Sequence, residues 1–161
     1  GDDLYLEVIG PDETQPEMAG RRILGLDAIE APYLAWYAVR PFLMPLTCGE
    51  FETAGYVPGE LIQGHRELPD GSALGWQMTD PSVRLVDGLL PLVIEWDLDS
   101  KHPGASATPG VSLAEFRIEH PEASKLAETF LILGLPKVHE GEKPRLVAGF
   151  DTPNGRVELT G

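Results

Sequence analysis

The sequence has 161 residues, of which 12 are Lys or Arg and 26 are Asp or Glu, so the net charge is −14. A chain of this length forms one ordinary domain or two small modules. Its 42% apolar content predicts a folded core rather than a disordered acidic tail. The negative charge excludes general binding to nucleic-acid backbones and to anionic membranes, because like charges repel. We therefore expect no nucleic-acid partner and no membrane partner.

Cys48 is the only cysteine, so no disulfide can form within the chain. Its neighbours at helical spacing are apolar and no basic residue adjoins it, which predicts a packed, unreactive thiol. No window approaches the roughly 20 apolar residues that a membrane span needs. Since the sequence also shows no basic segment followed by an apolar one, we expect a cytoplasmic protein.

The first third of the chain predicts two strands and a helix. Residues 4–9 form an apolar run that reads as a strand, and a polar connection follows over residues 11–32. Residues 33–39 are aromatic and β-branched, which favours a buried strand. The following helix is expected to end at Gly55, and its apolar positions recur at helical spacing: Met44, Cys48, Phe51 and Ala54.

The next segment predicts a hairpin and a further strand. Residues 60–68 and 72–79 flank Pro69-Asp70-Gly71, a sequence typical of a tight turn. Residues 89–98 read as a largely buried strand, and residues 99–111 read as a linker.

The same succession of elements then returns. Residues 113–119 predict a strand, Pro121 suits the first turn of a helix, and Gly134 suits its end. One helical face is apolar and consists of Ala123, Leu126, Ala127, Phe130 and Leu133. Three more strands are expected: around Val138, over residues 145–150 and, after the Asn154-Gly155 turn, over residues 156–160.

Residues 33–98 and 112–161 therefore each predict a β-α-β-β-β unit, and such repetition is a sign of duplicated supersecondary units. Residues 1–32 would carry the last strand of a truncated first unit and a connection. On this interpretation on the order of 40 residues precede the chain. Each closing strand places a glutamate between two large apolar residues, and these glutamates are Glu7, Glu95 and Glu158.

The tandem units resemble the vicinal oxygen chelate superfamily, which includes glyoxalase I, extradiol dioxygenases and bleomycin-resistance proteins, and more narrowly its glyoxalase-like domain proteins. The resemblance covers nearly the whole chain. It implies an α+β fold of tandem β-α-β-β-β units whose curved, mostly antiparallel sheets form an open cup. The segments that carry it are residues 3–9 (DLYLEVI), 65–71 (HRELPDG) with Trp76, 90–96 (LPLVIEW) with His102-Pro103, and 151–159 (DTPNGRVEL).

The resemblance also implies a divalent metal ion inside the cup, of unspecified identity, with Glu7 and Glu95 as ligands and Glu95 as a base. The family's first-strand ligand is His or Gln, but its spacing falls on Ala35 and Ala114, which cannot bind a metal. The simpler interpretation of Glu7, Glu95 and Glu158 is that each lies on the solvated face of an antiparallel strand.

Three further residues are candidates for substrate binding. Arg66 shares a strand face with apolar residues, so it either pairs with a ligand carboxylate or extends its charged end to water. Trp76 either packs in the core or provides a ligand platform. His102 lies in a loop before Pro103, where binding residues are common, although it could equally be a surface histidine.

Two main functions follow from the resemblance. The first is a metal-dependent lyase, isomerase or dioxygenase that acts on a small oxygenated metabolite. The alternative is a non-catalytic module of the bleomycin-resistance type, which sequesters a small molecule without metal and whose acidic surface suits cationic compounds. A third interpretation is a scaffold in which only the dimer interface matters. In each case we expect a homodimer.

Overall fold

The computed structural model describes residues 4–12, 14, 16, 22–68 and 70–161. The described part contains two α-helices, α1 (Met44–Thr53) and α2 (Ala123–Ile132), and short 3₁₀ turns at Ile23–Ala28, Val86–Gly88 and Pro103–Ser106. Its strands are β1 (Ala38–Val39), β2 (Leu61–Glu67), β3 (Ala73–Thr79), β4 (Leu92–Trp96), β5 (Ser112–His120), β6 (Val138–Glu140), β7 (Arg145–Thr152) and β8 (Gly155–Thr160).

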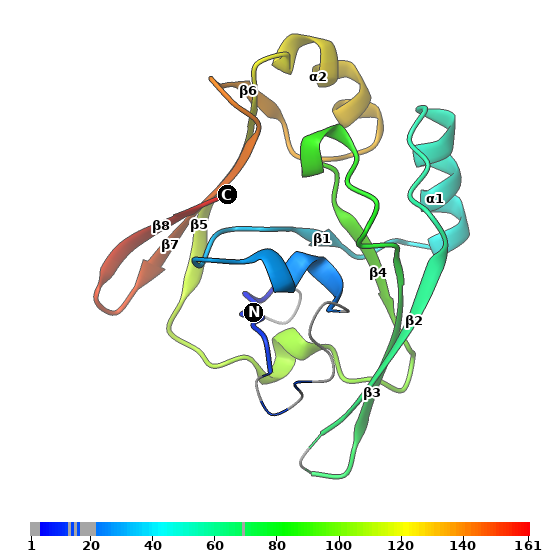
Figure 1. The fold of residues 1–161 in the computed structure, drawn as a ribbon, viewed down its shortest axis with the longest axis vertical. Helices are drawn as coiled ribbons and strands as arrows, with labels where there is room; N and C mark the ends of the chain where they lie inside the picture. The colour runs from blue at the N-terminus through cyan, green and yellow to red at the C-terminus, as the bar shows by residue number, and fades with distance from the viewer. Residues whose placement is uncertain (1–3, 13, 15, 17–21, 69) are drawn as a thin grey trace.

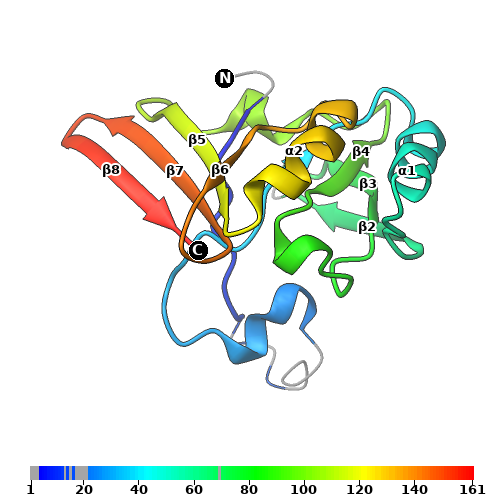
Figure 2. The same cartoon turned by 90° about the horizontal axis from the view of Figure 1, so that it is seen from above.

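The strands form two mixed sheets of four, ordered β1-β4-β3-β2 and β6-β5-β7-β8. In each sheet one pair is parallel, β1 with β4 and β5 with β6, and the other pairs are antiparallel. Figures 1 and 2 show the sheets side by side, with α1 on the outer side of the first sheet and α2 at one end of the molecule. The predicted α+β fold of tandem units with open sheets is confirmed.

The two units share their order of elements but differ in strand pairing. In the first unit the opening strand β1 pairs with the closing strand β4. In the second unit the opening strand β5 is internal, between β6 and β7, and the closing strand β8 lies at the edge. Because β5 is already paired on both sides, it cannot join the first sheet edge to edge.

One predicted strand does not form, and another forms only in part. Residues 4–9 belong to no strand, and their side chains at Leu6 and Val8 are 47% and 91% exposed. This segment runs between the two sheets in both views (Figures 1 and 2). Of residues 33–39, only Ala38–Val39 joins a ladder. The apolar, aromatic and β-branched residues were sufficient to predict extended backbone, but a strand also needs a partner backbone to bond with.

The helices follow the prediction closely, because left-handed glycines end them. Gly55 (φ 89°) follows α1 and Gly134 (φ 64°) follows α2, and this conformation costs glycine little. Ala127 is exposed, so the apolar face of α2 is narrower than the sequence predicted. The Cys48 thiol is half-buried, 3.8 Å from the sulfur of Met44, and burial raises its pKa, as expected for an unreactive thiol.

The core joins the two sheets. One buried cluster contains Met44, Phe51 and Val93, and the other is built around Ile118, Phe130 and Leu146. Leu133 and Leu135, at the end of α2, pack against both clusters. The α2 end therefore connects the units into one core.

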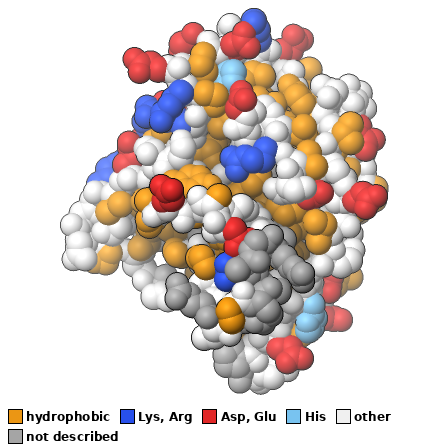
Figure 3. Space-filling view, viewed as in Figure 1, with side chains coloured by type: hydrophobic (Ala, Val, Ile, Leu, Met, Phe, Trp, Pro, Cys, Tyr) orange, Lys and Arg blue, Asp and Glu red, His pale blue; other side chains and the backbone are white. Residues whose placement is uncertain are grey.

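Apolar side chains gather in a band across one face, with acidic side chains spread round its edges (Figure 3). Within the described ranges, the helices are too short or too polar to cross a membrane.

Candidate functional site

The first sheet has two chemically different faces, because side chains alternate along each strand. We call one the helix face, which carries Gln63, Gln77, Val93 and Glu95 and packs beneath α1. We call the other the aromatic face, which carries Gly64, Arg66, Trp76 and Trp96.

Glu95 lies on the helix face and is half-buried. Its Oε1 accepts a hydrogen bond from the backbone N–H of Met44, with a nitrogen-to-oxygen distance of 3.4 Å. Its Oε2 accepts a hydrogen bond from the side-chain amide of Gln77, the residue opposite it on β3. Met44 is the first residue of α1, and the preceding residue, Leu43, offers no side-chain cap. Glu95 therefore supplies both an acceptor and a favourable negative charge at this helix end.

Glu7 lies elsewhere, in the extended segment between the sheets. It is exposed, and its Oε2 is 3.5 Å from the hydroxyl of Tyr5. Burial of the phenol, together with the nearby Glu7 charge, raises the pKa of Tyr5 to about 12. The Tyr5 ring contacts His102, which in turn contacts Trp96 on the aromatic face. Glu7 and Glu95 are thus associated with opposite faces of the first sheet.

This arrangement does not fit the metal site that the resemblance implies. The two proposed ligands are separated by the sheet, and Glu95 is engaged by the helix end and by Gln77. Among the described residues, no group of three His, Cys, Asp or Glu side chains is placed to share an ion.

The aromatic face carries a row of rings. The centroids of Trp76 and Trp96, which lie opposite each other on β3 and β4, are 5.4 Å apart. Trp76 also lies across Gly64 of β2, where an added Cβ would come within 2.1 Å of the indole. Gly64 is therefore required by the close approach of Trp76, and the two tryptophans cover the middle of this face.

His102 and Tyr5 extend the row beyond the sheet. The His102 ring meets Trp96 at 6.1 Å and Tyr5 at 5.6 Å between centroids, both edge to face. The Nδ1 of His102 accepts a hydrogen bond from the backbone N–H of Gly104, so Nε2 carries the proton of the neutral ring. Each of the four rings is half-buried, so part of each is accessible.

Arg66 lies on β2 at the end of the aromatic face, opposite Leu74 and diagonal to Trp76. Its side chain is exposed, and none of the residues that the structure describes forms an ion pair with it. The structure thus brings Arg66, Trp76 and His102 to one face of the first sheet, and it separates them from Glu95.

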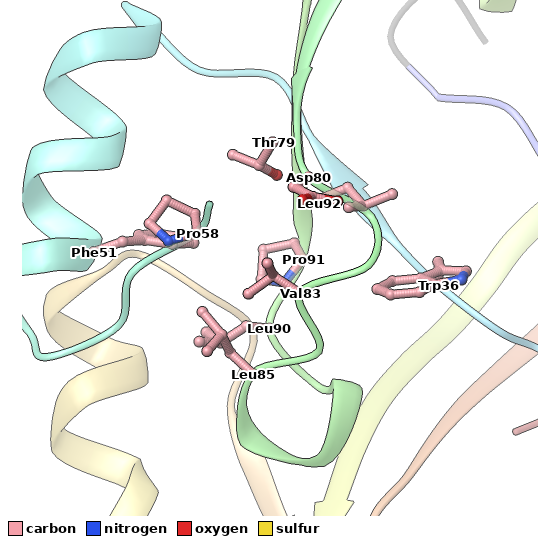
Figure 4. Close-up of a pocket in the computed structure, with 10 residues that line it drawn as sticks. All are labelled: Trp36, Phe51, Pro58, Thr79, Asp80, Val83, Leu85, Leu90, Pro91 and Leu92. Carbon is pink, nitrogen blue, oxygen red and sulfur yellow. The ribbon is translucent and has the colours of Figure 1, made fainter. Parts of the chain in front are cut away.

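A small cavity lies near Trp36, where β3 ends and β4 begins (Figure 4). Its volume of about 10 Å³ corresponds to about one water molecule, so it cannot hold a substrate. Trp36 stacks beneath the guanidinium of Arg84, 4.3 Å from the ring centroid. The lining is mostly apolar and consists of Trp36, Phe51, Pro58, Thr79, Asp80, Val83, Leu85, Leu90, Pro91 and Leu92.

Glu158 belongs to a network of charges on the second sheet. Its Oε2 is 3.7 Å from Arg117, which is itself 2.7 Å from both Glu115 and Glu119. Arg156 is 2.8 Å from Glu115. This solvated, paired environment agrees with the simpler interpretation of Glu158.

His120 and Asp87 form a contact that was not predicted from the sequence. His120 is 7% exposed, and its Nε2 lies 3.0 Å from the Asp87 carboxylate. Its Nδ1 accepts a hydrogen bond from the backbone N–H of Glu122, so Nε2 is the donor to Asp87. Asp87 and its neighbour Val86 have φ values of 54° and 51°, which are unusual for residues other than glycine. No sequence spacing could reveal a pair 33 residues apart.

Comparison with protein families decides the identity. The family model for the glyoxalase-like domain matches residues 1–134, which is most of the chain. The chain belongs to the glyoxalase-like domain family. This domain is part of the vicinal oxygen chelate superfamily, so the resemblance inferred from the sequence is confirmed. No curated protein and no solved structure matches the chain.

The match covers all of the first sheet of this glyoxalase-like domain and extends to the end of α2. Strands β6, β7 and β8 lie outside it. The aromatic face is therefore within the family region, whereas Arg156 and Glu158 are not.

Proposed function

We propose that this glyoxalase-like domain binds a small planar organic acid on the aromatic face of its first sheet. The observation that carries the proposal is the continuous row of Trp76, Trp96, His102 and Tyr5, with Arg66 at its end. Partly exposed aromatic rings favour stacking with a flat ligand.

Arg66 supplies the preference for an acid. A guanidinium can pair with both oxygens of a carboxylate, and such charge-assisted hydrogen bonds are stronger than neutral ones. The net charge of −14 opposes anions at long range, but this effect is screened beyond about 8 Å at physiological salt. Arg66 lies beside Trp76 at one end of the row, whereas Glu7 lies with Tyr5 at the other end, so the carboxylate of the ligand is expected beside Arg66.

The metal-dependent activity expected from the resemblance has less support. Glu95, the proposed base and ligand, serves the end of α1, and Glu7 lies with Tyr5. The binding interpretation needs neither residue. We therefore favour a small-molecule binding module over a metal-dependent lyase, isomerase or dioxygenase.

Tryptophan fluorescence tests this proposal. In a Trp36→Phe background all tryptophan emission comes from Trp76 and Trp96, so its quenching reports on the aromatic face. We expect benzoate to quench and saturate, and benzamide and benzylamine to bind more weakly. Arg66→Gln should weaken benzoate binding by about tenfold and leave benzamide unchanged, and Trp76→Leu should weaken all of these ligands.

Arg84→Gln is the matched control, because it removes an arginine that contacts Trp36 and not the aromatic face. Equal loss of benzoate binding in the Arg66 and Arg84 variants would contradict the proposal, as would tighter binding of benzylamine. Stoichiometric divalent metal in protein purified without chelator, lost on Glu95→Ala, would favour the enzyme instead.

A further inference from the structure

Strand β8 is an exposed edge. It is the last strand in the order β6-β5-β7-β8, and every residue from Gly155 to Glu158 is exposed. The β7–β8 hairpin projects from the body of the molecule in both ribbon views (Figures 1 and 2). An unpaired strand edge presents free N–H and C=O groups and is a template for another strand.

The outward backbone groups of β8 can be identified. Thr152 pairs with Gly155 across a two-residue turn, and pairs that bond to β7 alternate with pairs that do not. The carbonyl of Thr160 points away from β7, since it accepts a hydrogen bond of 3.0 Å from Leu34 N–H. By alternation, the N–H and C=O groups of Arg156 and Glu158 also point outward.

In one register, the side chains of two copies of β8 are complementary in charge. If a second β8 runs antiparallel about Val157, Arg156 of each copy lies opposite Glu158 of the other. These two positions are the ones whose backbone groups point outward, so both pairs would be hydrogen-bonded pairs. Val157 is 46% exposed and lies on the other face of the sheet from Arg156 and Glu158. There it would contact Val157 of the second copy.

The charges are held in place before any contact is made. Arg156 lies 2.8 Å from Glu115 and 3.7 Å from Asp151, and Glu158 lies 3.7 Å from Arg117. An added Cβ at Gly149 would come within 2.6 Å of Arg156, so this arginine lies flat over β7. Opposite charges placed across a strand pair favour that register.

The other strand edges fit a second copy less well. Antiparallel pairing of β2 about Gly64 would place Ile62 opposite Arg66 and Leu61 opposite Glu67, and these pairs are not complementary. Strands β1 and β6, with two and three residues, are too short to form a stable ladder.

We infer that two copies of this chain associate through β8, antiparallel about Val157, so that their second sheets form one continuous sheet. The partner is thus a second copy, and the dimer is reversible because a single strand pair buries little area. This interface does not involve the aromatic face and does not depend on its ligand.

Site-directed cross-linking tests the register. Replacing Cys48 with Ser leaves no thiol, and Val157→Cys then places two thiols on the two-fold axis. The Cα atoms of a non-hydrogen-bonded antiparallel pair are about 4.5 Å apart, a distance that permits a disulfide. With oxidised glutathione, we expect disulfide-linked dimer to form at least tenfold faster from Val157→Cys than from Leu159→Cys or Val57→Cys in the same background. Equal rates would overturn the inference.

Charge exchange tests the pairing. In sedimentation experiments on the 161-residue chain, Arg156→Glu and Glu158→Arg should each raise the dimer Kd at least tenfold. The double variant restores opposite charges between the two copies but reverses them against Glu115, Asp151 and Arg117 of the same chain, so it should bind more tightly than either single variant. Circular dichroism confirms that every variant is folded. A chain that stays monomeric up to its solubility limit would refute the inference, and so would a double variant that binds no more tightly than the single ones.

Discussion

The carboxylate of Glu95 lies 3.4 Å from the backbone nitrogen of Met44. An acidic residue on β4 therefore caps the N-terminus of α1, which begins 51 residues earlier in the chain. The same carboxylate accepts a hydrogen bond from Gln77. Its position ties α1 to the middle of the first sheet. This is a structural role, and it can be separated from ligand binding by experiment.

Replacing Glu95 should therefore destabilise the fold. We expect Glu95→Ala to lower the free energy of unfolding by about 1–2 kcal/mol, because the N–H of Met44 loses its acceptor. Glu95→Gln keeps an acceptor and should lose about 0.5 kcal/mol through the missing charge. Urea unfolding measures both, and Glu7→Ala is the exposed control, with a change within about 0.5 kcal/mol. Equal effects of the two alanine variants would argue against this role.

The Gly64 position makes a second prediction, about packing. A methyl group at Gly64 would overlap the indole of Trp76, so Gly64→Ala should cost about 1–3 kcal/mol and displace that ring. Gly49→Ala, within α1 and with no atom near its Cβ, should instead stabilise by about 0.5–1 kcal/mol. Thermal unfolding and near-ultraviolet circular dichroism distinguish these outcomes. An unchanged tryptophan signal in Gly64→Ala would contradict the observed contact.

Glu119 gives a prediction about pH. Hydrogen bonds from Arg117 and then Arg145 hold the pKa of Glu119 below its ordinary value of 4.5. Since the pKa is lower in the folded than in the unfolded chain, the stabilising effect is complete above 4.5 and is lost as the pH falls through the lowered pKa. The difference in melting temperature between the wild type and Glu119→Gln should therefore be largest near neutral pH.

That difference should shrink steadily once the pH falls below about 4. Glu128→Gln, on the exposed side of α2, is the control and should behave like the wild type throughout. A Glu119→Gln effect that does not vary with pH would show that packing, and not charge, accounts for it.

The strained turn at Asp87 provides the fourth prediction. Asp87→Ala and Asp87→Gly both remove the 3.0 Å contact with His120, so both should destabilise the fold. Glycine adopts a φ of 54° without the penalty that a Cβ brings, so the glycine variant should be more stable than the alanine variant by about 1 kcal/mol. Equal stabilities in urea unfolding would mean that the turn relaxes when its aspartate is lost.

Local signals predicted much of this fold. The Asp70-Gly71 turn, the helix stops at Gly55 and Gly134, and most strands followed from turn chemistry and periodicity. Residues 4–9 were less predictable, because an apolar run does not contain its own hydrogen-bonding partner. The strand order of the second unit was also not predictable, since each of its strands could pair in several ways.

The sequence allows only part of the candidate site to be predicted, and strand alternation explains why. Val93 and Glu95 are two residues apart, so they must share a face, and Val93 is fully buried against α1. That spacing was visible in the sequence and would have placed Glu95 beneath the helix. The resemblance alone placed it in the cup. Gln77 carried no signal of its own, because only the register of β3 against β4 brings it to Glu95.

The internal position of β5 limits how copies of this chain could exchange segments. To release β5, a molecule would have to break two ladders at once, one with β6 and one with β7. The β7–β8 hairpin is held to the sheet by one ladder alone. Domain swapping would therefore proceed through the hairpin, with the central strand retained as the part of the sheet that opens last.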